Sequence, residues 1–122
     1  MEDKWYLPQE VELEEQGFIK AEVLVPCDSL WFSGHFPEEP ILPGVAIIQM
    51  VWQAIVRGTG KQSKEITLDA LKRVRFTQPV RPGERVSVHI TCGGSGDKVS
   101  YTFKVLSRGN VICSGLIAAG KR

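Results

Sequence analysis

One segment of the chain carries apolar residues at helical spacing. It follows Pro43-Gly44, and its apolar side chains recur at steps of three and four residues: Val45, Ile48, Val51, Trp52 and Ile55. This period is typical of an amphipathic helix. Because glycine weakens a helix and often ends one, the helix is predicted to end before Gly58 and Gly60.

The rest of the pattern predicts strands. Apolar and polar residues mix at strand spacing from Phe18 to Val25, which is the first predicted strand. Four further segments after the helix show the same patterning: Ile66 to Phe76, Val86 to Ile90, Val99 to Leu106, and Val111 to Ala118. The glycine-rich stretch 93–97 suits a hairpin loop, and Arg108-Gly109-Asn110 suits a turn. We therefore expect consecutive antiparallel strands.

One helix between an early strand and a series of long strands predicts an α+β fold, in which a long antiparallel sheet wraps around one central helix. The length of 122 residues fits a single domain, residues 1–122. Such a sheet would leave one face open and one edge strand unpaired. We therefore expect at least a homodimer, or a higher homo-oligomer.

Composition narrows the class of protein. Apolar residues make up 43% and charged residues 24%, with 15 Lys and Arg against 14 Asp and Glu. These values are ordinary for globular domains and do not indicate a nucleic-acid partner. The acidic start, interrupted by Pro8, does not resemble a secretory signal, and no apolar run reaches the roughly 18 residues that cross a bilayer. The expected location is cytoplasmic, with no membrane partner.

Three cysteines, Cys27, Cys92 and Cys113, are odd in number and widely spaced. They form no CxxC pair and give a poor basis for a disulfide framework, so reduced thiols are expected. Cys27 lies nearest the segment with candidate chemistry. We interpret it as a small buried hydrophobe rather than as a nucleophile.

The segment from Trp31 to Gly44 carries the candidate chemistry. Its three prolines and its glycines fix an irregular path directly before the helix, which would hold His35 in one position. The helix start offers unpaired N–H groups at Gly44 and Val45, with a favourable dipole. A neutral imidazole beside such donors suits proton removal next to a thioester carbonyl, because the donors stabilise the negative charge on oxygen.

The stretch GHFPEEPILPGVAIIQMVWQ, which begins at Gly34, closely resembles the signature of the (3R)-hydroxyacyl-acyl carrier protein dehydratases. Phe76, Pro79-Val80, Pro82-Gly83 and Gly115 are similar to that family's downstream pattern, so the resemblance runs from about residue 18 onward. It implies a hotdog fold and a lyase that interconverts a (3R)-hydroxyacyl thioester with the trans-2-enoyl thioester and water. It implies no metal or redox cofactor, and a substrate carried by acyl carrier protein or coenzyme A.

The resemblance also implies roles for particular residues. His35 takes the place of the family's catalytic histidine, and Gln49 takes the place of the acid that protonates the leaving hydroxyl across the dimer interface. The substrate-binding positions fall on Phe36, Gly44, Val45 and Gln53. The amide at Gln49 departs from the family pattern, because it has no proton to release near neutral pH.

Three outcomes are compatible with this departure from the family pattern. His35 performs both proton transfers, or a carboxyl such as Glu38 or Glu39 replaces the acid, or the protein binds a thioester without dehydrating it. Losing general acid catalysis typically costs on the order of 10² to 10⁴ in rate. A non-catalytic acyl-thioester-binding subunit and an acyl thioesterase are therefore the alternative functions.

Other residues have weaker claims to a role. One interpretation is an acyl tunnel lined by Trp31, Phe32, Trp52 and the Ile41-Leu42 pair, although ordinary core packing explains Trp52 equally well. His89 is predicted to be exposed on the polar face of its strand. Several basic residues have two interpretations: they border a pocket mouth, or they are simply solvated. They are Arg57, Lys61, Lys72, Arg73, Arg75, Arg81 and Arg85.

Overall fold

The computed structural model of the chain describes residues 9–14, 17–27, 41–59, 66–95 and 98–121. It contains one helix, α1 (Gly44–Thr59), within this part of the chain. The strands are β1 (Gln9–Glu14), β2 (Phe18–Leu24), β3 (Ile66–Phe76), β4 (Arg85–Ser95), β5 (Lys98–Ser107) and β6 (Asn110–Lys121).

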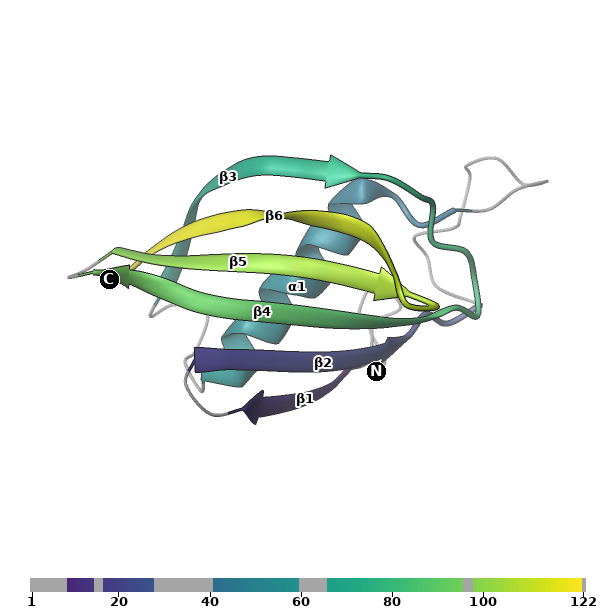
Figure 1. Cartoon of the computed structure of the whole chain (residues 1–122), viewed down its shortest axis with the longest axis horizontal. Helices are drawn as coiled ribbons and strands as arrows, with labels where there is room; N and C mark the ends of the chain where they lie inside the picture. Colours follow the sequence, from purple (N-terminus) through teal and green to yellow (C-terminus); the bar gives the residue numbers. More distant parts are fainter. Residues whose placement is uncertain (1–8, 15–16, 28–40, 60–65, 96–97, 122) are drawn as a thin grey trace, which may run out of the picture.

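The strands form one six-stranded antiparallel sheet in the order β1-β2-β4-β5-β6-β3. The sheet curves around α1, which crosses behind it from the end of β3 toward β1 and β2 (Figure 1). Every second residue of the central strands faces this helix, so that Phe103, Ile90 and Ile117 are buried on the inner face. This arrangement confirms the expected hotdog fold.

Two features of the sheet differ from the sequence-based prediction. The strand at Phe18 is the second and not the first, because β1 precedes it and pairs with it residue by residue from Gln9 opposite Val23. β3 does not lie beside β4, the next strand in sequence, but pairs with β6. In the described sheet, β1 and β2 are neighbours in sequence order, and so are β4, β5 and β6, whereas β3 lies at the edge beyond β6.

The helix seats one apolar face on the sheet. The buried residues recur at helical spacing and are Ala46, Ile47, Met50, Val51, Ala54, Ile55 and Gly58. α1 packs mainly against β1, β2 and β4, the half of the sheet away from β3. No helix in the described residues is long and apolar enough to cross a membrane.

The prediction that the helix ends before Gly58 is wrong. The helix runs through Gly58 to Thr59, whose hydroxyl donates to the carbonyl of Ile55 at 2.8 Å. Gly58 is needed inside the helix because a Cβ there would meet Cγ2 of Ile19 at 2.7 Å. Since Ile19 is only 1% exposed, it has no room to move aside, and the missing side chain lets α1 approach β2 closely.

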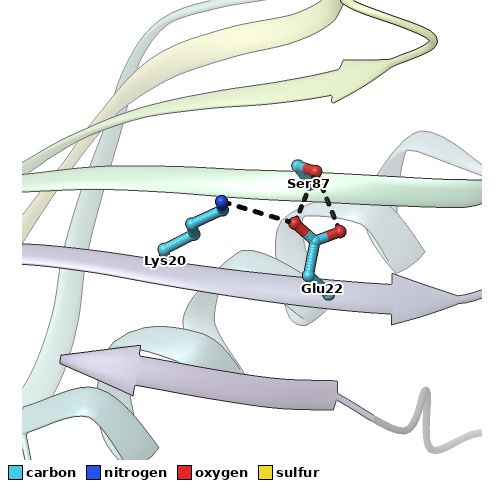
Figure 2. A network of polar contacts seen from close by, with 3 residues as sticks. All are labelled: Lys20, Glu22 and Ser87. Atoms are coloured by element: carbon cyan, nitrogen blue, oxygen red, sulfur yellow. Dashed lines mark hydrogen bonds and ion pairs between the residues drawn. The ribbon is translucent and has the colours of Figure 1, made fainter. Parts of the chain in front are cut away.

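Polar side chains on the outer face of the sheet form a small network. Figure 2 shows the hydroxyl of Ser87 donating to both carboxylate oxygens of Glu22, each at 2.9 Å, with the Lys20 ammonium 3.9 Å from that carboxylate. These residues come from β2 and β4, where Glu22 stands directly opposite Ser87. The network links two strands on the outer face but adds little stability, because it is partly solvated.

We expect Gly58→Ala to lower the free energy of unfolding by about 1–3 kcal/mol, because the added methyl overpacks the contact with Ile19. Urea denaturation measures this change. Gly93→Ala is the matched control, since a Cβ at Gly93 would meet only the Ser100 hydroxyl at an ordinary 3.4 Å. Equal effects of the two substitutions would contradict the close approach at Gly58.

Candidate functional site

The start of α1 is held in place by backbone hydrogen bonds. The N–H of Leu42 donates to the carbonyl of Val80 at 2.7 Å, which ties the segment before the helix to the segment after β3. The carbonyl of Pro43 then accepts from Ala46 at 3.0 Å and from Ile47 at 3.3 Å. Pro43 therefore closes the first turn, and the helix begins at a fixed place beside the end of β3.

The two N–H groups that precede this first hydrogen-bonded pair belong to Gly44 and Val45. No acceptor within the described residues faces either group, as is usual for the first turn of a helix. The partial positive charge of the helix start lies at the same point. An oxygen that carries negative charge would be stabilised here.

Gly44 also sits against an aromatic ring. A Cβ at Gly44 would lie 2.9 Å from Cζ of Phe76, so any side chain there would push the ring aside. Phe76 stands opposite Cys113 in the sheet and so belongs to the face toward α1, yet it is 49% exposed. Gly44 thus lets the Phe76 ring pack directly against the first turn of α1.

A pocket of about 320 Å³ opens at this place. Its walls are mostly apolar, and its lining comes from the helix start and from the end of β3 and the residues after it: Ile41, Leu42, Gly44, Ile47, Phe76, Thr77, Gln78 and Pro79. An apolar pocket with a few convergent polar groups is the usual form of a small-molecule site. Ile41 and Leu42 thus line a pocket, and its use as an acyl tunnel stays a prediction.

The other predicted site residues on α1 do not line this pocket. Gln49 and Val45 are exposed on the side of α1 that the sheet leaves uncovered, Val45 to 64%. Gln53 is half-buried and has a polar partner. Neither glutamine lines the pocket at Gly44.

The remaining site predictions fall outside the described residues. His35 and Phe36 belong to this group, and so do Trp31, Phe32, Glu38 and Glu39. Trp52 is described, and it packs partly buried against the core rather than on the pocket. The roles of His35 and Phe36 therefore stay predictions.

The sequence analysis did not assign Thr77, Gln78 and Pro79 to the site. They follow β3 and lie more than thirty positions after Gly44 along the chain, so no local pattern connects them with the helix start. Phe76 and Pro79 did stand out, but only as part of the family resemblance. His89, predicted to be a surface residue, is exposed as expected.

The cysteines are free thiols in different surroundings. The interpretation of Cys27 as a buried hydrophobe is wrong, because it is exposed in the turn that follows β2. Cys113 is fully buried in β6, and its burial raises the pKa of the thiol to about 11. Burial also raises the pKa of Cys92. Within the described residues, no three His, Cys, Asp or Glu side chains gather in a way that suits a metal ion.

Thiol labelling of the native protein at pH 8 should modify Cys27 quickly and leave Cys113 unmodified, because the reactive species is the thiolate and the Cys113 thiol is both buried and protonated. Mass spectrometry after iodoacetamide treatment measures this difference. Labelling in urea, where every thiol is accessible, is the control. Rapid modification of Cys113 in the folded protein would contradict the described core.

Comparison with known proteins relates this chain to several characterised or solved proteins. A 3-hydroxyacyl-[acyl-carrier-protein] dehydratase FabZ from Sinorhizobium fredii is 42% identical over 85 residues, which are 66% of this chain and 55% of the relative. A FabZ from Verminephrobacter eiseniae is 38% identical over 88 residues, with 66% and 59% covered. The match spans little more than half the length of these curated relatives.

A solved structure has the same fold. One chain of the dehydratase heterocomplex ApeI:P from Xenorhabdus doucetiae superposes with a TM-score of 0.75 at 21% identity, covering 95% of this chain and 99% of that one. In addition, the sequence profile of the ApeI-like family, described as ApeI dehydratase, matches residues 10–116. Because that match spans most of the chain, this protein belongs to the ApeI-like dehydratase family.

Proposed function

We propose that this protein is a dehydratase that interconverts a (3R)-hydroxyacyl thioester with the trans-2-enoyl thioester and water, in the biosynthesis of fatty acids or related acyl chains. Membership of the ApeI-like family and 42% identity to a FabZ relative support this reaction class. The observation that carries the proposal is the start of α1, where the N–H groups of Gly44 and Val45 lie beside an apolar pocket.

The chemistry needs an electron-rich oxygen to be stabilised. Removing the proton from the carbon next to the thioester carbonyl moves negative charge onto the carbonyl oxygen. The N–H groups of Gly44 and Val45 suit this charge, because they lie at the positive end of the helix dipole and no other acceptor in the described residues competes for them. The apolar lining of the pocket suits the acyl chain.

His35 is the proposed base, by its place in the family signature nine residues before Gly44. In its neutral form its imidazole takes the proton from the carbon, a C=C bond forms, and the C–O bond to the hydroxyl breaks. The departing hydroxide must receive a proton to leave as water. Gln49 cannot provide one, so the same imidazole is proposed to return the proton it removed.

The exposure of Gln49 supports a role at a shared surface rather than in the core. Its amide lies on the uncovered side of α1, one turn after Val45. An amide at this position is suited to hold the hydroxyl or a water molecule by hydrogen bonds. Glu38 and Glu39 remain alternative proton donors, as the sequence analysis proposed.

We expect His35→Ala to lower the rate of hydration of a short trans-2-enoyl thioester by on the order of 10² to 10⁴, the usual value of acid–base catalysis. Loss of the conjugated absorbance measures the rate. His89→Ala is the matched control, because His89 is exposed on a strand far along the sequence from the signature. Gln49→Glu should raise the rate, since it restores a proton donor. A wild-type rate in His35→Ala would rule out the proposed base.

The second candidate function is an acyl-thioester-binding subunit with little activity of its own. Gln49 favours it, because the chain lacks the acid of the family pattern at this position. The related Xenorhabdus doucetiae protein was solved within a dehydratase heterocomplex, which gives a precedent for a mixed assembly. For this candidate, neither wild type nor His35→Ala turns over the enoyl thioester, while the ligand still raises the unfolding temperature. Release of free thiol would instead indicate a thioesterase.

The proposal includes a homodimer that covers the β3 edge. β3 is an edge strand of the sheet, and its Leu68, Leu71 and Phe76 pair with the core positions Ala119, Ile117 and Cys113. These three side chains are therefore on the face toward α1, yet they are 39%, 45% and 49% exposed. Because α1 covers the opposite half of the sheet, a second copy is the proposed cover for this half.

Leu71→Lys should convert the proposed dimer into a monomer, because a charge would be buried in the interface. Size-exclusion chromatography with light scattering measures the mass. Leu24→Lys is the matched control: Leu24 is 51% exposed as well, but it lies at the end of β2. If Leu71→Lys keeps the mass of the wild type, this interface does not exist.

The proposal also covers the group that carries the acyl substrate and the cellular location of the protein. The curated relatives are named for substrates on acyl carrier protein, which supports an acyl carrier protein thioester, with the coenzyme A thioester as the alternative. The free thiols of Cys27, Cys92 and Cys113 are compatible with a reducing compartment such as the cytoplasm.

A further inference from the structure

A second groove lies on the outer face of the sheet, away from α1. It has a volume of about 580 Å³ and spans the adjacent strands β5, β6 and β3, with Gly94 of β4 at its border. Small or medium side chains form its floor, namely Ser100 on β5 with Leu116 and Ala118 on β6. Their neighbours Ile117 and Tyr101 are buried on the opposite face, so the groove and the pocket at Gly44 are separate sites.

Three cationic side chains line this groove: Lys72, Arg73 and Lys98. Within the described residues, none of them is within ion-pair distance of a carboxylate, in contrast to Lys20 in the network of Figure 2. The one carboxylate in the lining belongs to Asp69, and it accepts a hydrogen bond from the Thr67 hydroxyl at 2.9 Å. The groove therefore holds a surplus of positive charge.

The backbone of β3 is distorted so that Lys72 and Arg73 both reach this groove. The side chains of successive residues in a regular strand point to opposite faces of the sheet. Here Lys72 stands opposite Leu116 and Arg75 opposite Ser114, which leaves Arg73 and Val74 together opposite Gly115. This is a β-bulge, and bulges redirect side chains.

Arg73 adopts the conformation that such a bulge usually gives to glycine. Its φ is 54°, in the left-handed region that costs a residue with a side chain free energy. Arg108 has the same φ of 54°, but it lies in the tight turn between β5 and β6, where the hairpin itself demands positive φ. At Arg73 the strand continues on both sides, and glycine would satisfy the backbone better.

We propose that this outer groove binds a phosphate group, with Arg73, Lys72 and Lys98 as its ligands. A phosphate carries nearly two negative charges near neutral pH and accepts several hydrogen bonds, which suits three cations around one groove. The guanidinium of Arg73 provides paired donors for two phosphate oxygens. The Ser100 hydroxyl on the floor adds a neutral donor. This inference is independent of the dehydratase reaction.

Titration of the ¹⁵N-labelled protein with inorganic phosphate tests the proposal by following backbone amide shifts. Sodium chloride at equal ionic strength controls for general screening. We expect saturable shifts centred on Arg73, Lys98 and Ser100. Shifts that do not saturate, or that chloride reproduces, would overturn the proposal.

Arg73→Gly separates a binding role from a structural one. It removes the guanidinium while giving the bulge its preferred residue, so the unfolding temperature should stay equal or rise while the phosphate affinity falls by about tenfold or more. Arg108→Gly is the matched control, because it makes the same change at the same φ outside the groove. Lys98→Gln is a second variant that leaves the bulge intact. Unchanged phosphate affinity in Arg73→Gly and Lys98→Gln would refute the site.

The source of the phosphate is found by comparing pantetheine, 4′-phosphopantetheine and coenzyme A in the same titration. We expect phosphopantetheine to bind at least about tenfold more tightly than pantetheine, because only the former has a phosphate. Equal affinity for phosphopantetheine and coenzyme A supports a single phosphate, as on a carrier protein arm. Tighter binding of coenzyme A supports its nucleotide phosphates. Equal binding of pantetheine and phosphopantetheine contradicts a phosphate site.

Discussion

The packing of α1 on one half of the sheet is the interaction on which the other features depend. The buried side of the helix, from Ala46 to Gly58, lies against the inner faces of β1, β2 and β4. Its C-terminal end approaches β2 so closely that Gly58 has no room for a side chain beside Ile19. Because the helix is straight and crosses the sheet at an angle, its first turn then lies at the opposite edge, against the end of β3 (Figure 1).

This placement explains both the pocket and the uncovered surface. The first turn meets Phe76 at Gly44, where the missing side chain makes room for the ring, and no acceptor in the described residues bonds the N–H groups of Gly44 and Val45. The same crossing leaves the middle of the inner face of β3 without a helix over it, so Leu71 stays exposed although its partner Ile117 is fully buried. Catalysis and assembly at this edge therefore share one physical origin in the proposed function.

The two faces of β3 are suited to different ligands. Toward α1 the strand offers Phe76 and Leu71, which are apolar, while on the outer face it contributes Lys72 and Arg73 to a cationic groove. A regular strand divides its side chains between two faces by simple alternation. The bulge at Arg73 breaks that alternation and moves one more cation to the outer face. The strained backbone conformation of Arg73 therefore lies in the cationic groove. Strained residues commonly occur at binding sites.

Features that depend on neighbours along the chain could be predicted from the amino-acid sequence. Helical spacing after Gly44 and strand spacing in the later segments follow from local periodicity, and the N–H groups of Gly44 and Val45 follow from the start of any helix. The meeting of distant segments became evident only in the folded chain. The tertiary structure placed β3 beside β6, kept Gly58 inside the helix, exposed Cys27 and brought Phe76 to Gly44. These outcomes depend on packing and strand pairing between residues far apart in sequence, which no local pattern records.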